Sequence, residues 1–417
     1  ACCTNQKLQK ETDIIDVWFD SGVSHQAVLK KSNELKYPAD LYLEGSDQHR
    51  GWFQSSLTTA VALEGDSPFD GVLTHGFVVD GEGKKMSKSA GNVVAPQDVM
   101  KEFGADILRL WVSSCDYQYD VRLSKEILKQ LAEAYRKIRN TFRYLLGNLC
   151  DFNPAKNQLP FEKLSRLDQW AIQEVDHLAN LVKQSYEEFR FHEIYRDIYD
   201  FCVVEMSSYY FDVLKDTLYT AGEDSFLRRS AQTALFHILS QLVMMLAPIL
   251  PFTMDEVWAA YGMDKGMASV HASLWKVPDH AVKAPFWRDW NEIRKVRDAV
   301  MPALERKRTA NVIGSSLDAK IYLKVSAHLP PELNRILTEN WNELRRVFIV
   351  SQVEAFDGTR SGAEEIDLTF GEAQVKLTLS VEKADGKKCE RCWNYSVQVG
   401  NFQEHPTLCE RCVEAIR

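Results

Sequence analysis

The hydrophobic pattern of the first part of the chain alternates between short apolar runs and stretches with a helical period. The apolar runs cover residues 13–19, 39–43 and 71–79, and glycine, aspartate or serine flanks each of them. Such runs are typical of buried strands, whereas residues 51–63 carry a helical pattern. Strands that alternate with helices predict an α/β layer with a parallel sheet.

A helical period replaces this alternation beyond residue 123. Apolar side chains recur at three- and four-residue steps from Leu128 to Leu149, which predicts one face of a long helix. Further helical stretches at residues 168–218 and 225–261 predict that this part of the chain is a helix bundle.

The pattern becomes mixed after the bundle. A charged helix is predicted at residues 287–308, and strand-like segments follow at residues 319–325 and 374–380. Stretches rich in Pro, Gly, Asn or Asp act as joints at residues 151–160, 276–285 and 357–365. The resulting domain prediction is an α/β domain at 1–122, a helical domain at 123–280, an α+β domain at 281–380 and a small terminal domain at 381–417.

Composition narrows the class of protein. The chain is 45% hydrophobic and 26% charged, which is typical of a folded globular protein. Its net charge of -9 argues against a general nucleic-acid coat, so any RNA surface must be a local basic patch. The most apolar stretch, residues 235–250, contains His237 and Pro248 and is shorter than the ~20 residues that a bilayer requires. We therefore expect no membrane helix.

The cysteines suggest a metal centre rather than a disulfide framework. Nine cysteines without regular spacing favour a reducing, cytoplasmic setting. Four of them form two C-x-x-C pairs that are sixteen residues apart, as in a four-thiolate zinc ribbon: Cys389, Cys392, Cys409 and Cys412. A redox pair or two disulfides are alternatives, and His405 could replace one ligand. The last ~35 residues are too few for a core of their own, so a structural Zn²⁺ would supply their folding free energy.

A basic loop follows the third apolar run. Its sequence, GEGKKMSKS at residues 81–89, combines two glycines with three lysines. Lysine binds phosphate oxygens as a compact point charge, and a mobile loop of this kind can close over a triphosphate. On composition alone, a solvated basic loop is an equally good interpretation.

The motifs around this loop resemble a known family. KMSKS at residues 85–89 occurs together with DVWFDSG at 16–22, GSDQHRGWF at 45–53 and THGF at 74–77. In this order they are similar to isoleucyl-tRNA synthetases, which are class I aminoacyl-tRNA synthetases, and the resemblance runs through the helical part to the four terminal cysteines. Valyl and leucyl enzymes are relatives that we expect to differ at the 16–22 and 45–53 stretches.

The resemblance implies a fold and an activity. The implied fold is the C-terminal half of a Rossmann-like catalytic domain, followed by a helical anticodon-binding domain, a junction domain and a zinc-binding domain. The implied reaction attaches isoleucine to tRNA(Ile) through isoleucyl-adenylate, with ATP as substrate and Mg²⁺ accompanying it. A cytoplasmic protein that is monomeric at full length is also implied.

The resemblance further implies site residues. Lys85 and Lys88 would be catalytic, with Met86, Ser87, Ser89 and His75 completing the ATP site. The residues expected to hold the aminoacyl-adenylate are Glu44, Gly45, Asp47 and Gln48, with Trp18 and Trp52 as walls of the isoleucine pocket. Each of these residues also has an alternative role. Glu44 and Asp47 could cap the following helix, the two tryptophans could pack in the core, and His75 could be structural. Basic helix faces at residues 125–143 and 288–308 are candidates for RNA contact, or are simply solvated.

Two features of the family are absent from this sequence. It contains no HIGH-type motif and no editing domain. We therefore expect the C-terminal piece of a synthetase about twice as long, which cannot form the adenylate by itself. A non-catalytic tRNA-binding fragment, or a valyl or leucyl relative, remains an alternative.

Overall fold

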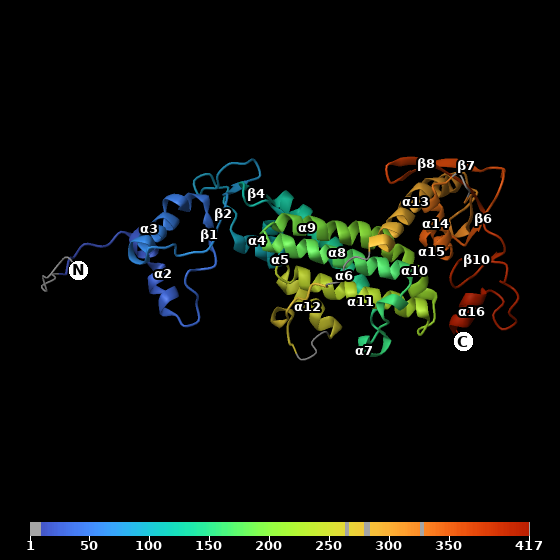
Figure 1. The fold of residues 1–417 in the computed structure, drawn as a ribbon, viewed down its shortest axis with the longest axis horizontal. Helices are drawn as coiled ribbons and strands as arrows, with labels where there is room; N and C mark the ends of the chain where they lie inside the picture. Colours follow the sequence, from blue (N-terminus) through green and yellow to red (C-terminus); the bar gives the residue numbers. More distant parts are fainter. Residues whose placement is uncertain (1–9, 263–266, 279–283, 326–328, 417) are drawn as a thin grey trace. The chain divides into compact units, whose positions relative to one another are not determined.

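The computed structural model describes residues 10–262, 267–278, 284–325 and 329–416 (Figure 1). The chain divides into two compact units, Ala1–Gln130 and Leu131–Arg417. Cys2 and Cys3 lie outside the described residues. Among the described residues, no helix is both long and apolar enough to cross a membrane. The cysteines described by the structure all have free thiols, in agreement with the expected absence of a disulfide framework.

The first unit contains two pairs of short parallel strands. Strand β1 (Tyr42–Gly45) pairs with β2 (Val72–His75), and β3 (Val78–Asp80) pairs with β4 (Val121–Leu123). The parallel arrangement is confirmed, but it consists of two separate pairs. The α-helices of this unit are α1 (Val17–Gly22), α2 (Ser24–Ala27), α3 (Trp52–Glu64), α4 (Pro96–Phe103) and α5 (Ala105–Ser114). Helix α6 (Lys125–Asn148) begins in this unit and continues into the second.

The prediction of a strand at residues 13–19 is wrong, because helix α1 begins at Val17. The Asp16 side chain accepts a hydrogen bond from the Trp18 backbone amide at 2.8 Å, which caps the first turn. Val17 and Phe19 remain largely exposed instead of facing a sheet. An apolar run therefore resembled a strand, while the capping aspartate determined the local structure.

The strand predicted at residues 71–79 is broken at Gly76, so that β2 and β3 join different pairs. The Gly76 amide donates to the Tyr117 carbonyl at 2.8 Å. A Cβ at position 76 would lie 2.4 Å from the carbonyl group of Tyr119, a distance that only glycine avoids. Close backbone approach at this residue thus redirects the chain just after His75.

The second unit is built on the predicted helix bundle, which the structure confirms. Helices α8 and α11 pack side by side (Figure 1). Large apolar side chains of the bundle, such as Trp170, are buried. The bundle helices are α7 (Pro154–Asn157), α8 (Arg166–Glu187), α9 (Phe191–Asp200), α10 (Phe211–Thr220), α11 (Phe226–Leu246) and α12 (Pro251–Tyr261). Between α9 and α10, Phe201–Tyr210 is a π-helix, where the Ser207 and Ser208 hydroxyls each donate to the carbonyl five residues earlier at 2.8 Å.

A long helix leads from the bundle to a four-stranded sheet. Helix α13 (Ala284–Thr309) confirms the predicted charged helix and contacts both α8 and the sheet. The strand order is β6-β5-β8-β7, of which β5 and β8 were predicted. The elements are α14 (Pro331–Glu339), α15 (Trp341–Phe348), β5 (Ala319–Leu323), β6 (Gln352–Ala355), β7 (Glu364–Phe370), β8 (Ala373–Lys383), β9 (Lys387–Lys388), β10 (Tyr395–Ser396) and α16 (Glu410–Ile416).

One carboxyl group between α8 and α13 makes bundle stability depend on pH. Glu174 accepts a hydrogen bond from the Trp287 indole at 2.8 Å, and burial together with the nearby Glu205 raises the pKa of Glu174 to about 7. Because this pKa is higher in the folded state than in the unfolded state, stability is lost as pH rises from about 4.5 to about 7.

We therefore expect Glu174→Gln to stabilise the bundle at pH 8 by on the order of 1–2 kcal/mol, and by much less at pH 5. Urea unfolding at both pH values, followed by circular dichroism, measures the difference. Glu187→Gln on the exposed side of α8 is the matched control and should change little at either pH. An equal gain at pH 5 and pH 8 would show that the charge of Glu174 is not responsible.

Candidate functional site

The carboxyl ends of β1 and β2 bring candidate residues together in the first unit. In the parallel register, Glu44 lies opposite Thr74, and Gly45 lies opposite His75. Ligands of open α/β sheets bind beyond the carboxyl ends of the strands. The arrangement therefore places the predicted acidic residues and the predicted histidine at one edge of the same strand pair.

The Asp47 and His75 side chains both lie next to Gly45. A Cβ built at position 45 would lie 2.7 Å from Asp47 Oδ1 and 3.6 Å from His75 Cε1. The His75 ring is itself held by a 2.8 Å hydrogen bond between Nδ1 and the Gly76 carbonyl. Any larger residue at position 45 would displace the Asp47 carboxylate, so the glycine keeps that carboxylate against the strand end.

The capping role considered for the two acids belongs to Gln48 instead. Its Oε1 accepts a hydrogen bond from the Trp52 amide at 3.0 Å, at the start of α3, and its Nε2 donates to Asp47 Oδ2 at 3.3 Å. Glu44 and Asp47 are exposed and cap nothing. Two carboxylates are thus available to a ligand, while Gln48 fixes one of them relative to the helix.

The two tryptophans have different surroundings. Trp52 stacks on Tyr42 with ring centroids 4.2 Å apart, and its indole donates to the Ser21 carbonyl at 3.0 Å. One face of the Trp52 ring is therefore covered by Tyr42, and its indole N–H is already hydrogen-bonded. Trp18 is 46% exposed, and its ring edge would lie 2.9 Å from a Cβ at Gly51. Of the two, Trp18 offers the more accessible ring next to Gln48.

The lysine-rich loop after β3 is anchored at both ends by one carboxylate, a feature that sequence reasoning missed. Asp80 Oδ1 accepts from the amides of Glu82 and Lys84, and Asp80 Oδ2 accepts from Asn92 Nδ2 at 2.8 Å. The hydrogen bond from Asn92, followed by that from the Lys84 amide, lowers the pKa of Asp80. An Asp and an Asn that bracket the motif were the available sequence signal.

Within this loop the lysines differ in their partners. Lys84 forms an ion pair with Glu82 at 2.7 Å. Lys85 and Lys88 are exposed, and no carboxylate of the described residues lies within ion-pair distance of either. Lys85 Nζ lies 5.9 Å from the centre of the Phe77 ring, two residues beyond His75. The two lysines predicted to act on phosphate therefore carry charge that no acidic side chain in the described ranges neutralises.

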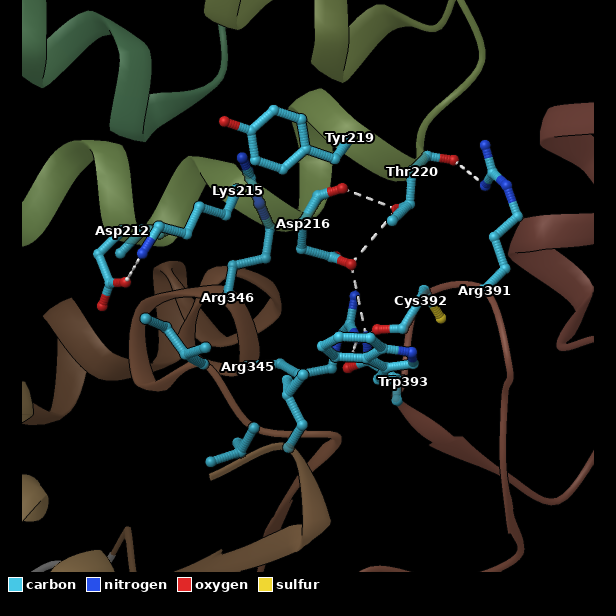
Figure 2. Close-up of a pocket in the computed structure, with 15 residues that line it drawn as sticks. Asp212, Lys215, Asp216, Tyr219, Thr220, Arg345, Arg346, Arg391, Cys392 and Trp393 are labelled. Atoms are coloured by element: carbon cyan, nitrogen blue, oxygen red, sulfur yellow. Dashed lines mark hydrogen bonds and ion pairs between the residues drawn. The ribbon is translucent and has the colours of Figure 1, made fainter. Parts of the chain in front are cut away.

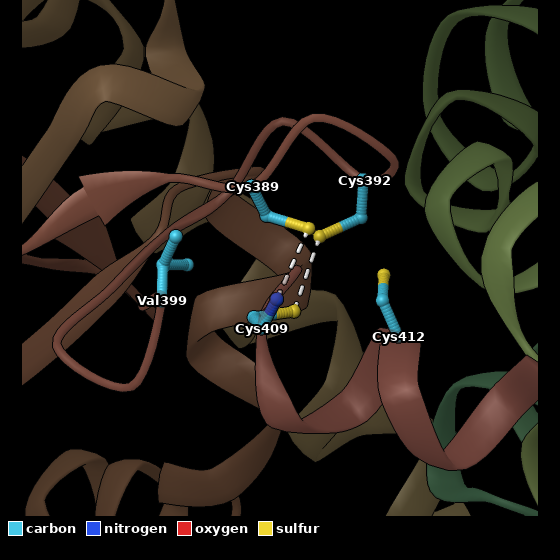
Figure 3. Packing of buried hydrophobic residues seen from close by; sticks show 5 residues of the cluster. All are labelled: Cys389, Cys392, Val399, Cys409 and Cys412. Carbon is cyan, nitrogen blue, oxygen red and sulfur yellow. Dashed lines mark hydrogen bonds between the residues drawn. The ribbon is translucent and has the colours of Figure 1, made fainter. Parts of the chain in front are cut away.

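The four terminal cysteines meet in the second unit, with all four ligand atoms within 4.8 Å of one another (Figure 3). The Cys392 and Cys409 sulfur atoms are 3.6 Å apart. A tetrahedral zinc ion with Zn–S bonds of ~2.3 Å requires S···S distances of ~3.8 Å, so the thiol set fits Zn²⁺. All four side chains are buried, and His405 is not part of the cluster.

Hydrogen bonds around the sulfur atoms favour a thiolate at Cys392. The Cys409 amide donates to Cys389 Sγ at 3.3 Å, and Arg391 Nη1 lies 3.6 Å from Cys412 Sγ. The hydrogen bond with Cys412, followed by those from the Asn394 amide and Arg411, lowers the pKa of Cys392 to about 4. Burial raises the pKa of Cys409 to about 11, and the hydrogen bond with Cys392 raises the pKa of Cys412. Among the described residues, Val399 and Leu408 are the apolar side chains that pack against the cysteines. A bound metal ion would therefore be the main stabilising group of this zinc ribbon, residues 386–416.

A cavity of about 380 Å³ lies between α10, α15 and the ribbon (Figure 2). Lys215 and Tyr219 of α10 line it on one side, and Arg345 lines it from α15. The Arg345 guanidinium contacts the amide oxygen of Asn394 at 3.3 Å, and burial lowers the pKa of this arginine. Asp212 and Asp216 also line the cavity, and Lys215 pairs with Asp212 at 2.9 Å, so the cavity carries charges of both signs.

The basic helix faces are only partly available. Arg294 pairs with Glu205 at 2.5 Å, and Arg297 donates to the Val347 carbonyl at 2.9 Å. These two arginines hold α13 in place rather than facing solvent. Arg139 and Arg143 of α6 are exposed, and neither has an acidic partner among the described residues. They are the stronger RNA-contact candidates.

Three family profiles match the chain in order. Residues 2–124 match "tRNA synthetases class I (I, L, M and V)", and residues 168–323 match "Anticodon-binding domain of tRNA ligase". Residues 386–415 match "Zinc finger found in FPG and IleRS", which agrees with the four-cysteine geometry. The matched regions thus include the strand-end site, the bundle and the metal centre.

Similar proteins extend this agreement over the whole chain. An isoleucine–tRNA ligase of Syntrophotalea carbinolica is 50% identical over 415 residues, which is 99% of this chain and 44% of that protein. One of Geobacter sulfurreducens is 48% identical over 421 residues, again 44% of its length. The chain therefore spans less than half the length of these relatives. Among solved structures, the LeuRS of Agrobacterium radiobacter K84, in a ternary complex with tRNA and LeuAMS, matches 66% of this chain and 34% of that chain, with a TM-score of 0.52 and 20% identity.

Proposed function

Because the chain belongs to the isoleucine–tRNA ligase family of class I tRNA synthetases, we propose that it forms part of an enzyme that attaches isoleucine to tRNA(Ile). The reaction uses ATP, with Mg²⁺, to form isoleucyl-adenylate and then transfers the acyl group to the terminal ribose. The observation that carries the proposal is that Glu44, Asp47 and His75 lie at the carboxyl end of one strand pair, with Asp47 and His75 next to Gly45. The lysine-rich loop follows soon after in the chain.

The loop supplies charge to the phosphates in this proposal. Lys88, with Lys85 assisting, binds the ATP phosphates and stabilises the negative charge that develops on the leaving pyrophosphate. Met86, Ser87 and Ser89 shape the loop between Asp80 and Asn92, where the Ser87 amide donates to Asn92 Oδ1 at 2.9 Å. No protein nucleophile is needed, because the isoleucine carboxylate attacks the α-phosphate, and catalysis consists of positioning and electrostatics.

The strand end holds the adenylate in the same scheme. Glu44 and Asp47 accept hydrogen bonds from the ribose hydroxyls and the isoleucine ammonium group, while Gly45 lets the ligand approach the backbone. Gln48 positions Asp47, and His75 borders the nucleotide. Trp18 forms a wall of the isoleucine pocket, and Trp52 supports that wall from its stacked position on Tyr42.

The second unit binds tRNA in this proposal. Exposed arginines on α6, especially Arg139 and Arg143, follow the RNA backbone, and the bundle receives the anticodon arm. The ribbon holds one zinc ion through Cys389, Cys392, Cys409 and Cys412. A closed four-thiolate site leaves no position for substrate, so the zinc is structural. We place the enzyme in the cytoplasm as a monomer, where free thiols and the ribbon remain reduced.

The catalytic half requires further polypeptide to be active. Its apolar surface is extensive: Ile14 is 94% exposed, Val17 70% and Leu43 54%. Parallel sheets are normally covered on both faces, and an isolated strand pair is marginally stable. The chain alone therefore lacks the surroundings in which Glu44, Asp47 and the lysines converge on ATP.

A chimera provides the test. The chain replaces the matching segment of the Syntrophotalea carbinolica isoleucine–tRNA ligase, and ATP–pyrophosphate exchange is measured with isoleucine, valine and leucine. We expect ATP–pyrophosphate exchange with isoleucine in preference to valine and leucine. We also expect the chimera to charge tRNA(Ile). The parent ligase is the positive control, and the isolated chain should show no exchange.

Three outcomes would contradict the proposal or a part of it. A folded, zinc-loaded chimera that exchanges with none of the amino acids would make the chain a non-catalytic tRNA-binding fragment. A preference for valine or leucine would assign it to a relative with another substrate. Exchange by the isolated chain would refute the need for further polypeptide.

A further inference from the structure

The two cysteine knuckles of the ribbon have the same sequence, Cys-Glu-Arg-Cys, at residues 389–392 and 409–412. In each knuckle an arginine precedes the second thiol, Arg391 in the first and Arg411 in the second. Both arginines reach the last turn of α10, although 171 and 195 residues separate them from their partners. A four-thiolate zinc site does not itself require such contacts, so their convergence on one helix needs a separate explanation.

Arg391 joins a zinc ligand to the end of α10. Its Nη1 donates to the carbonyl of Thr220, the last residue of α10 (Figure 2). The same Nη1 lies 3.6 Å from Cys412 Sγ. Carbonyl groups at a helix C-terminus carry partial negative charge and lack partners within the helix, so a guanidinium group is favourable there. One nitrogen atom thereby contacts both the metal centre and the bundle.

Arg411 makes the corresponding link from the second knuckle. It forms a two-pronged ion pair with Asp216, in which Nη2 and Oδ1 are 2.7 Å apart and Nη1 pairs with Oδ2. Asn394, which follows the first knuckle, donates to the Cys392 carbonyl at 3.1 Å and to Asp216 Oδ1 at 3.4 Å. Asp216 is therefore contacted from both knuckles, and the forked geometry makes the pairing specific.

Charge favours the same arrangement. Four thiolates around one divalent zinc ion would carry a net charge of about -2. Arg391 and Arg411 together with Asp216 contribute a net charge of about +1 next to them, which offsets part of it. Groups that hydrogen-bond to metal ligands orient them and raise metal affinity. Arg391 contacts the Cys412 sulfur atom, and Arg411 directly precedes that cysteine in the chain. In the closed arrangement seen here, both arginines also contact α10.

We infer that zinc binding and docking of the ribbon on α10 are coupled through Arg391 and Arg411. Metal binding closes the knuckles and presents both arginines to Thr220 and Asp216. Docking on α10 in turn favours the closed knuckles and strengthens zinc binding, since the coupling between two equilibria is reciprocal. The inference is independent of the aminoacylation activity proposed above.

Asp216→Asn tests the coupling by removing the charge that pairs with Arg411 while conserving the shape of the side chain. We expect zinc affinity, measured by competition with a chromophoric chelator, to fall roughly tenfold. Asp212→Asn is the matched control, because Asp212 lies one turn earlier on α10 and pairs with Lys215 and Arg297 instead. The control should bind zinc as the unaltered protein does.

Hydrogen exchange gives a second readout in the unaltered protein. Removing zinc with a chelator should accelerate amide exchange at residues 217–222, the end of α10 and the start of the next loop, while the core of α11 stays protected. Arg411→Lys repeats the affinity measurement from the other side of the ion pair, should Asp216→Asn fold poorly. Two results would overturn the inference. One is an unchanged zinc affinity in the folded variants, and the other is amide hydrogen exchange at the end of α10 that stays the same when zinc is removed.

Discussion

Lys88→Ala in the active chimera should slow isoleucine-dependent ATP–pyrophosphate exchange by about 100- to 1000-fold, the loss typical when one preorganised charge-stabilising group is removed. Lys88 is exposed, and its charge is not neutralised by any carboxylate among the described residues. In the proposed reaction this charge acts on the phosphates mainly in the transition state. The maximal rate should therefore fall more than the affinity for isoleucine.

Lys84→Ala is the control within the same loop. It removes the same charge and a side chain of the same length, but Lys84 is already paired with Glu82 at 2.7 Å. We expect nearly unchanged exchange in this variant. Equal losses in Lys84→Ala and Lys88→Ala would mean that only the overall charge of the loop matters, and the specific role of Lys88 would then be abandoned.

Cys409→Ser should abolish stoichiometric zinc binding and unfold the ribbon. Structural zinc contributes about 10–16 kcal/mol in small zinc-binding domains, far more than Val399 and Leu408 can supply by packing. Elemental analysis should find one zinc per chain in the unaltered protein and much less than one in the variant. Limited proteolysis should then cleave within residues 386–416, while the bundle remains resistant.

Cys150→Ser separates this effect from general loss of a thiol, because Cys150 is exposed and lies outside the cluster. It should retain zinc and resist proteolysis. The disulfide alternative makes the opposite prediction, since disulfides would leave the unaltered protein without zinc and with fewer titratable thiols. Full zinc occupancy in Cys409→Ser would require another ligand in its place.

Short-range patterns predicted much of this molecule. The period from Leu128 to Leu149 gave helix α6 because each apolar side chain faces the same side of the bundle. The two C-x-x-C pairs predicted the cluster because two thiols so close in sequence necessarily lie on one side of a metal ion. The prediction of a strand at residues 13–19 failed, since the Asp16 carboxylate accepts a capping hydrogen bond from the Trp18 amide and starts a helix there instead.

Contacts between distant residues could not be predicted in this way. Arg294 and Arg297 looked like RNA-binding residues in the sequence, but Glu205 and Val347 lie far from them in the chain and engage them in the fold. The same limit concealed the pairing of Arg411 with Asp216. The sequence around a charged residue does not show whether its side chain will pair with a buried group or face solvent. That role becomes visible only in the tertiary structure.

The double anchoring at Asp80 has a consequence for motion. Because one carboxylate binds amides at residues 82 and 84 and the side chain of Asn92, the two ends of the lysine loop are already brought together. A hinge movement is then confined to the seven residues 85–91, and the entropy lost on closing so short a segment is small. Strand β3 and its partner β4 can stay rigid while the lysines swing.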